Sequence, residues 1–168
     1  AMKQLILVRH AKSDWGNPSL RDFDRPLNER GKKDAPEMAG RLKSKKIKID
    51  GIYTSAAKRA AKTAKAFAET MDIKNKHFHF KEDLYLASSE IFHEVITDAD
   101  NDYETIALFS HNEGITYFAN RLTNVRIDNI PTCGVFAVKI NCDRWKDFEK
   151  AEKEFWFFDY PKNVTTAS

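Results

Sequence analysis

The sequence predicts a single-domain α/β protein in three layers, with a mostly parallel central sheet and helices on both faces. Short apolar stretches typical of strands alternate with stretches that have helical periodicity. Two of the strand-like stretches, residues 5–8 and 105–109, are almost wholly apolar, as expected for parallel strands buried on both faces. A chain of 168 residues suits one hydrophobic core. We therefore expect one domain over residues 1–168.

Capping residues and hydrophobic spacing place the helices between the strands. Asn28, Ser55 and either Ser88 or Ser89 can each cap a following helix. The last two strands are separated by a charged segment, which favours antiparallel pairing at one edge of the sheet. The expected strands are 3–9, 51–54, 77–80, 105–109, 134–140 and 155–158, and the expected helices are 29–45, 56–71, 90–98 and 115–122.

The segment after the first strand is long and polar for a connection inside a compact domain. Residues 11–29 include Gly16, Pro18 and Pro26, which disfavour regular structure. Loops of this length are usually functional. We expect it to lie over the carboxyl edge of the sheet.

Composition argues against several classes of protein. Lys and Arg total 28 and Asp and Glu 25, so the overall field gives little reason to expect nucleic-acid binding. The longest apolar run near the N-terminus has four residues, too few for a signal peptide or a membrane span. Cys133 and Cys142 show no metal-binding or disulfide spacing. These features predict a cytoplasmic protein that does not bind membranes.

Cationic side chains follow three of the expected elements. Arg9 and His10 end the first strand, Arg59 lies in the first turn of a helix, and His111 follows the inner strand 105–109. In a parallel sheet, strand ends and helix N-termini share one edge, so these four residues can face one pocket. Two guanidiniums, two imidazoles and a helix N-terminus suit a tetrahedral dianion. The sequence predicts a phosphoryl-binding site.

Passive anion binding and phosphoryl transfer both fit this pocket. The positive charges beside His10 disfavour its protonation, so its imidazole should be neutral near pH 7. A neutral imidazole can attack phosphorus, while the arginines and the second histidine stabilise the charge on the phosphoryl oxygens. Water would then hydrolyse the phosphohistidine intermediate. A core strand followed by a solvated charged pair is the simpler explanation for Arg9 and His10 taken alone.

Four motifs follow one another along the chain: Arg9-His10, the segment 24–31, the segment 55–64, and Ser110-His111-Asn112. In this order they resemble the motifs of the histidine phosphatase superfamily, and the compact length resembles its small phosphohistidine phosphatases of the SixA type. The resemblance implies a phosphoglycerate mutase-like fold, with His10 as nucleophile and Arg9, Arg59 and His111 holding the phosphoryl group. It adds Arg25, Asn17 and Asn112 as substrate-binding residues.

One expected residue of larger relatives is missing. Phosphoglycerate mutases and many phosphomonoesterases have a glutamate general acid shortly after the third strand, where this chain reads Leu84-Tyr85-Leu86. Glu82 and Asp83 are nearby candidates. An alkoxide leaving group needs a proton, whereas the imidazole of phosphohistidine depends on one far less. Lack of the acid favours a P–N bond as the substrate.

Three functions therefore compete. The leading hypothesis is a phosphohistidine phosphatase that uses no metal or cofactor, works as a monomer and acts on a phosphohistidine-bearing protein. The second is a phosphomonoesterase that acts on small phosphorylated substrates, with Glu82 or Asp83 as the acid. The third is a non-catalytic module that binds phosphorylated ligands.

Other motifs have simpler explanations. Asp22 and Asp24 resemble the paired aspartates of metal-dependent phosphotransferases but follow no strand. His77, His79 and His93 could form a metal site, although solvated or hydrogen-bonded histidines are the simpler interpretation. The aromatic segment 155–160 fits the packing of an edge strand better than a docking surface.

Overall fold

The structure is a computed structural model that describes residues 2–163, so residues 1 and 164–168 of the predicted domain lie outside the described residues. It has a six-stranded sheet in the order β3-β2-β4-β1-β5-β6. The first four strands in this order are parallel, β5 is antiparallel to β1, and β6 is antiparallel to β5. The strands are β1 (Met2–Arg9), β2 (Gly51–Thr54), β3 (Phe78–Phe80), β4 (Thr105–Ser110), β5 (Val135–Asn141) and β6 (Lys153–Asp159).

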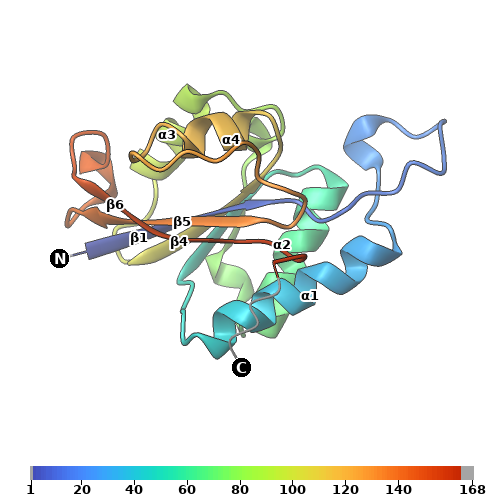
Figure 1. Ribbon diagram of the computed structural model, residues 1–168, viewed down its shortest axis with the longest axis horizontal. Coiled ribbons are helices and arrows are strands. Elements are labelled where there is room, and N and C mark those ends of the chain that lie inside the picture. Colours follow the sequence, from blue (N-terminus) through green and yellow to red (C-terminus); the bar gives the residue numbers. More distant parts are fainter. Residues whose placement is uncertain (1, 164–168) are drawn as a thin grey trace.

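The helices cover both faces of this sheet, as predicted. Figure 1 shows α1 (Glu29–Ser44) and α2 (Lys58–Thr70) below the strands, and α3 (Ser89–Thr97) and α4 (Gly114–Ala119) above them. Alternate side chains of β1 enter the two cores: Leu5 and Leu7 pack on the α3 and α4 side, and Ile6 and Val8 on the α1 and α2 side. Burial on both faces explains why this strand is apolar throughout.

Two of the three predicted caps are confirmed. The side chain of Asn28 accepts a hydrogen bond from the Gly31 amide at 2.8 Å, and Ser88 accepts one from Ile91 at 3.4 Å. The third prediction is wrong. The residue at the N-cap of α2 is Ala57, and the buried Ser55 contacts His111 instead.

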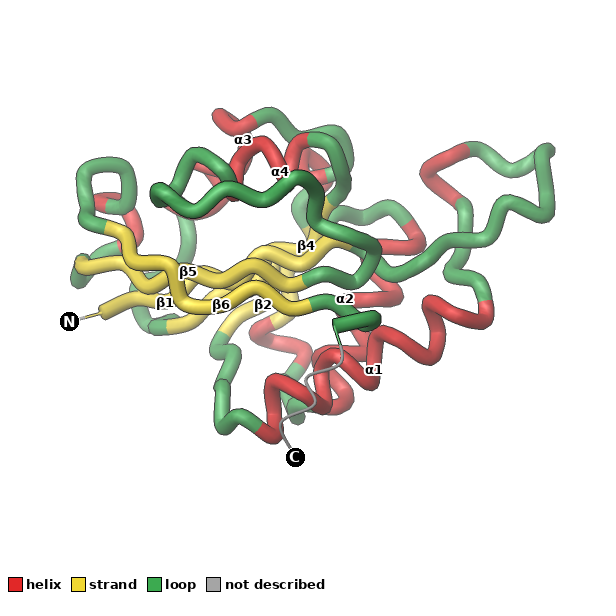
Figure 2. The backbone as a smooth tube through the Cα atoms, viewed as in Figure 1, coloured by secondary structure: helices red, strands yellow, loops and turns green. Residues whose placement is uncertain are grey.

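The two ends of the long loop after β1 are held together by backbone hydrogen bonds. The Asp14 amide donates to the Pro26 carbonyl at 2.8 Å, and the Asn28 amide to the Lys12 carbonyl at 2.9 Å. Gly31 permits this closure, because a Cβ atom there would lie 2.2 Å from the Lys12 carbonyl oxygen. Figure 2 shows the loop extending from the end of the sheet, with a single short helical segment, the 3-10 turn η1 (Asp22–Asp24).

The aromatic C-terminal segment packs into the core, as the simpler interpretation held. Phe155 and Phe158 of β6 lie with ring centroids 5.5 and 6.2 Å from that of Phe136, and Trp156 and Phe157 pack against the opposite core. Within residues 2–163, no helix is both long and apolar enough to cross a membrane.

Candidate active site

The site is built at the carboxyl edge of the sheet, where strand register brings distant residues together. Arg9 is the register partner of Ser110, and the His10 amide donates to the Ser110 carbonyl at 3.1 Å, so His10 and His111 leave neighbouring strands side by side. Their ring centroids are 5.1 Å apart. The Ser55 amide bonds the Phe109 carbonyl at 2.9 Å, which places Ser55 on the other side of β4. Parallel pairing thus determines these contacts.

The hydrogen bond made by His10 fixes which ring nitrogen carries its proton. Nδ1 lies 2.7 Å from the Ala11 carbonyl oxygen. A carbonyl only accepts hydrogen bonds, so Nδ1 must carry the hydrogen. In the neutral ring, Nε2 therefore carries an unprotonated electron pair. Arg59 Nε donates a hydrogen bond to that nitrogen at 3.4 Å.

The surroundings of His10 keep its imidazole neutral. Burial is the largest cause of the lowering of its pKa to about 4, and the charges of three nearby arginines add to this effect. The hydrogen bond to Ala11 opposes the lowering without reversing it. The imidazole of His10 is therefore uncharged at neutral pH.

His111 lies beside His10 with one ring nitrogen unpaired. Its Nε2 lies 2.8 Å from Ser55 Oγ, and its buried Nδ1 has no hydrogen-bond partner. Burial, followed by the charge of a protonated His10 and of Arg59, lowers the pKa of His111 to about 2. Buried polar atoms are rarely left unpaired in proteins. The unpaired Nδ1 of His111, next to the His10 ring, can therefore form a hydrogen bond with an oxygen of a ligand.

Arg59 is buried in the first turn of α2 and tied to the strand that carries His10. The Thr63 hydroxyl donates to the Arg59 carbonyl at 2.7 Å and accepts a hydrogen bond from the Ala11 amide at 2.9 Å. This hydroxyl links the start of the helix to the end of β1. The guanidinium therefore has a fixed position beside His10.

The guanidinium of Arg9 is also close enough to act on His10 and His111. One of its terminal nitrogens donates to the Ile130 carbonyl at 2.9 Å, while its buried Nε has no partner. Among the described residues, three buried side-chain nitrogens or oxygens have no partner, and two of them are Arg9 Nε and His111 Nδ1. Four cationic or hydrogen-bonding groups thus surround one position suited to an anion.

Sequence reasoning missed Asp22 and Tyr85, which complete the wall of the site. Asp22 Oδ2 accepts hydrogen bonds from Arg59 at 2.9 Å and from the Tyr85 hydroxyl at 2.5 Å, and Oδ1 accepts two from Arg25. Partial burial opposes ionisation, but these hydrogen bonds lower the pKa of Asp22 far below its usual value. In the sequence, the one sign of the contact between Asp22 and Arg25 is that they lie three residues apart, just before Pro26.

The predicted substrate-binding residues lie in different surroundings. The guanidinium of Arg25 donates hydrogen bonds to Asp22 and, at 2.7 Å, to Ser13 Oγ. Its central carbon lies 3.5 Å from the ring centroid of Trp15. Asn17 is exposed on the loop and bonds Ser19. Asn112 follows His111 directly and bonds Thr116 and Asn129. Arg25 is thus the one of the three that contacts Asp22, beside the nucleophile.

The residues considered as a general acid or as metal ligands lie in other surroundings. Glu82 and Asp83 form an exposed turn, and it is Tyr85 after them that meets His111, with centroids 5.4 Å apart. His77 belongs to a 3-10 turn rather than to β3, and both it and His79 contact the Tyr103 hydroxyl. Within the described part of the chain, no group of three or more side chains is arranged to hold a metal ion.

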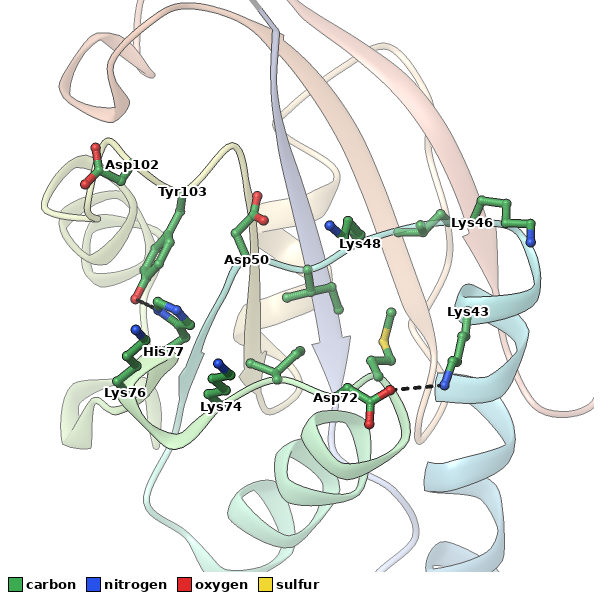
Figure 3. Close-up of a pocket in the computed structure, with 14 residues that line it drawn as sticks. Lys43, Lys46, Lys48, Asp50, Asp72, Lys74, Lys76, His77, Asp102 and Tyr103 are labelled. Carbon is green, nitrogen blue, oxygen red and sulfur yellow. Dashed lines mark hydrogen bonds and ion pairs between the residues drawn. The ribbon is translucent and has the colours of Figure 1, made fainter.

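A second cluster of cations lies at the opposite, amino edge of the sheet. Figure 3 shows it around a hollow of about 660 Å³, with Lys43 bonded to Asp72 and His77 to Tyr103. Both α1 and α2 end here, and lysines near helix C-termini neutralise the negative end of the helix dipole. We therefore assign Lys43 and Lys46, at the end of α1, to helix stabilisation. The labelled lysines are Lys43, Lys46, Lys48, Lys74 and Lys76.

Solved structures share this fold. The protein histidine phosphatase SixA in complex with tungstate superposes with a TM-score of 0.81 over 96% of this chain and 99% of that one, at 18% identity. A Nakamurella multipartitia protein with the provisional name phosphohistidine phosphatase SixA gives 0.84 over 96% and 98%, also at 18% identity. A phosphoserine phosphatase variant from Entamoeba histolytica, bound to phosphoserine, gives 0.67 at 16% identity over 97% and 100%.

Sequence relatives give the family. An uncharacterized chloroplastic protein of Arabidopsis thaliana is 30% identical over 153 residues, which cover 86% of this chain and 70% of that protein. Phosphoglycerate mutase 1 of Saccharomyces cerevisiae is 37% identical over 73 residues, 42% of this chain and 30% of the mutase. Phosphoserine phosphatase 1 of Hydrogenobacter thermophilus is 44% identical over 75 residues, 43% of this chain and 34% of that enzyme.

The sequence model of branch 1 of the histidine phosphatase superfamily matches residues 5–85, which include three of the four motifs quoted above. The fourth motif, at residues 110–112, lies beyond that match but follows the strand that pairs with β1. Together with the mutase-like fold, these matches show that the chain belongs to the histidine phosphatase superfamily.

Proposed function

We propose that this protein is a phosphohistidine phosphatase that acts on another protein through a phosphorylated His10. The observation that carries the proposal is the state of His10. Its Nε2 carries an unprotonated electron pair, its pKa is lowered to about 4, and Arg9 and His111 near it each have a buried nitrogen without a partner. A neutral nucleophile facing unpaired hydrogen-bonding groups suits attack on a bound phosphoryl group.

In the first step, His10 Nε2 forms a bond to phosphorus as the bond from phosphorus to the substrate nitrogen breaks. The bond from His10 Nδ1 to the Ala11 carbonyl persists, so the proton of the charged phosphoimidazole is already hydrogen-bonded. The substrate ring leaves as neutral imidazole if its other nitrogen holds a proton. Arg59, Arg9 and His111 would bind the phosphoryl oxygens during transfer.

In the second step, a water oxygen forms a bond to phosphorus and His10 leaves. The leaving imidazole takes back the electron pair on Nε2 and retains its proton on Nδ1, so the enzyme returns to its starting state. One proton of the water passes to the phosphate product or to solvent. Neither step requires a metal ion.

The surroundings of the site favour a P–N bond as the substrate. An ester would release an alkoxide, which needs a general acid. Glu82 and Asp83 lie on an exposed turn, and the low pKa of Asp22 leaves it ionised and unable to donate a proton. A protonated phosphohistidine brings its own proton.

The rim of the site supports a protein as the phosphoryl donor. Five large apolar side chains exposed around this edge come from the loop after β1, the end of β3, the turn that carries Tyr85, and α4. Contiguous apolar patches near a site are typical of protein-binding surfaces, and we propose that these five side chains contribute to one. They are Trp15, Leu20, Phe80, Leu86 and Tyr117.

Trapping of the intermediate tests the proposal. Acid-stable and acid-labile label should be measured after a phosphohistidine-bearing protein labelled with ³²P is mixed with the enzyme in the presence of a chelator. We expect acid-labile label on the wild-type protein and on His93→Ala, a control histidine on α3, and none on His10→Ala. Full turnover by His10→Ala would rule out this mechanism.

A phosphomonoesterase is the second candidate, favoured by the matches to phosphoglycerate mutases and a phosphoserine phosphatase. The two candidates differ in their relative turnover of phosphohistidine protein and small phosphate esters. Much faster ester cleavage would support the second. Saturable phosphate binding without phosphate release from any donor would indicate a non-catalytic module.

A further inference from the structure

A carboxylate of the protein itself binds the guanidinium groups beside His10. Two Arg59 nitrogens donate to Asp22, one to its backbone carbonyl at 2.6 Å and one to Oδ2 at 2.9 Å. The remaining nitrogen of the same guanidinium, Nε, faces His10 Nε2 at 3.4 Å. Asp22 and the proposed nucleophile therefore share one arginine, and the carboxylate lies next to the phosphoryl position.

The position of this carboxylate is determined by several contacts. Arg25 binds Oδ1 through Nε at 3.1 Å and Nη2 at 2.9 Å, and the Tyr85 hydroxyl binds Oδ2. The ring of Tyr85 is itself held edge-on against Phe23 and His111. These contacts hold Asp22 against Arg59, whose Nε donates to His10.

Burial differs between Asp22 and the arginines behind it. The side chains of Arg59 and Arg25 are 6% and 9% exposed, whereas that of Asp22 is 47% exposed. An anion that approaches these guanidiniums from solvent therefore meets the carboxylate first. Without Asp22, the two arginines would form a second anion site next to the phosphoryl group.

We propose that Asp22 is a specificity-determining residue that fills this second anion site and so excludes substrates with a carboxylate close to the phosphoryl group. The inference rests on the proposed function and narrows its substrate class to donors whose leaving group is neutral or cationic. The protonated ring of phosphohistidine is such a group, and a nearby carboxylate favours its charged form. Phosphoglycerate and phosphoserine carry a carboxylate that Asp22 would repel.

A matched pair of esters tests this proposal. 3-Phosphoglycerate and glycerol 3-phosphate share a carbon skeleton and differ in a carboxylate against a hydroxymethyl group. In the wild type we expect 3-phosphoglycerate to bind less tightly than glycerol 3-phosphate. The two affinities are measured as inhibition constants with a phosphohistidine protein as the substrate. In Asp22→Asn the ratio of affinities should shift toward 3-phosphoglycerate by about tenfold or more, because a charge-assisted contact to arginine becomes available.

Two further variants make the result specific to this carboxylate. Asp24→Asn is the control, because Asp24 lies in the same turn and its carboxylate pairs with the exposed Arg21. It should leave the ratio unchanged. Asp22→Ala should show the same shift as Asp22→Asn, and added formate should reverse the shift in Asp22→Ala by occupying the vacated position.

The binding measurements can be repeated by calorimetry with 3-phosphoglycerate and glycerol 3-phosphate, which requires no turnover. An unchanged ratio in both folded Asp22 variants would overturn the inference and leave the phosphohistidine proposal intact. Failure to trap label on His10 would instead overturn the proposed function, while the two ligands would still report on Asp22.

Discussion

Cationic side chains gather at both edges of this sheet, but only one edge is built for chemistry. At the carboxyl edge, arginines lie beside two buried, uncharged histidines, and strand register and Thr63 fix these positions. At the amino edge the cations are lysines at the ends of two helices (Figure 3). Burial together with unpaired nitrogens, rather than positive charge alone, marks a site for an anion.

The largest expected effect separates the two edges directly. Arg59→Gln should lower kcat/KM by about 10²- to 10³-fold, the usual loss when a preorganised charge-stabilising donor is removed. Lys74→Gln, which removes a charge at the amino edge, should change kcat/KM by less than about twofold. Initial-rate measurements on the same phosphohistidine protein decide the comparison. Equal losses in the two variants would contradict our assignment of the edges.

The pKa of His10 links the active edge to stability. The folded protein holds this pKa at about 4, below the value near 6.5 expected when the chain is unfolded. The neutral ring therefore contributes stability that is complete above about pH 6.5 and is lost as the pH falls toward 4.

His10→Asn should remove that part of the pH dependence. Between pH 7 and 4.5 we expect the variant to lose about 2 to 3 kcal/mol less stability than the wild type. Urea unfolding at the two pH values measures the difference, and NMR titration of the His10 ring should give a midpoint near 4. A midpoint near 6.5 would refute the proposed electrostatic environment.

Ser55 should have a smaller effect, because it acts through His111. Ser55→Ala removes the hydroxyl 2.8 Å from His111 Nε2, and we expect kcat/KM to fall about tenfold as the orientation of the ring is lost. The ¹⁵N chemical shifts of the ring report the tautomer directly. An unchanged tautomer together with unchanged activity would show that Ser55 does not position His111.

The smallest effect is expected at the amino edge. Replacement of Lys46, Lys48 and Lys74 by Gln together should leave kcat/KM within about twofold of the wild type. It should lower the free energy of unfolding by about 1 kcal/mol at low salt, and less at high salt, because the helix dipole loses compensating charge. Strong loss of activity would mean that this edge contributes to function.

The sequence predicted most of the fold because hydrophobic periodicity is local. The apolar run of β1 and the spacing along α1 sufficed to place those elements, and the caps were narrowed to Asn28 and to either Ser88 or Ser89, of which the structure has Ser88. Helix α4 was predicted through Leu122 but ends at Ala119. The side chain of the next residue, Asn120, donates to the Ile127 carbonyl and accepts a hydrogen bond from the Ile127 amide. That contact joins segments whose proximity no local pattern reveals.

The same limit applied to the site. His10, Arg59 and His111 could be identified because each follows a strand end or begins a helix, positions that converge in any parallel sheet. Asp22 and Ser55 could not. One lies in an irregular loop, and the other satisfied a local capping rule, so nothing in their own neighbourhoods indicated contacts with Arg59 and His111.

By itself, the sequence determined the layers of the fold and the edge at which its cations meet, because both follow from periodicity and from the parallel arrangement of strands. Only the tertiary structure decided which ring nitrogen of His10 carries the proton, which buried nitrogens of Arg9 and His111 lack a partner, and that the Asp22 carboxylate binds Arg59. Each of these depends on hydrogen bonds whose lengths and directions arise only when distant segments pack together.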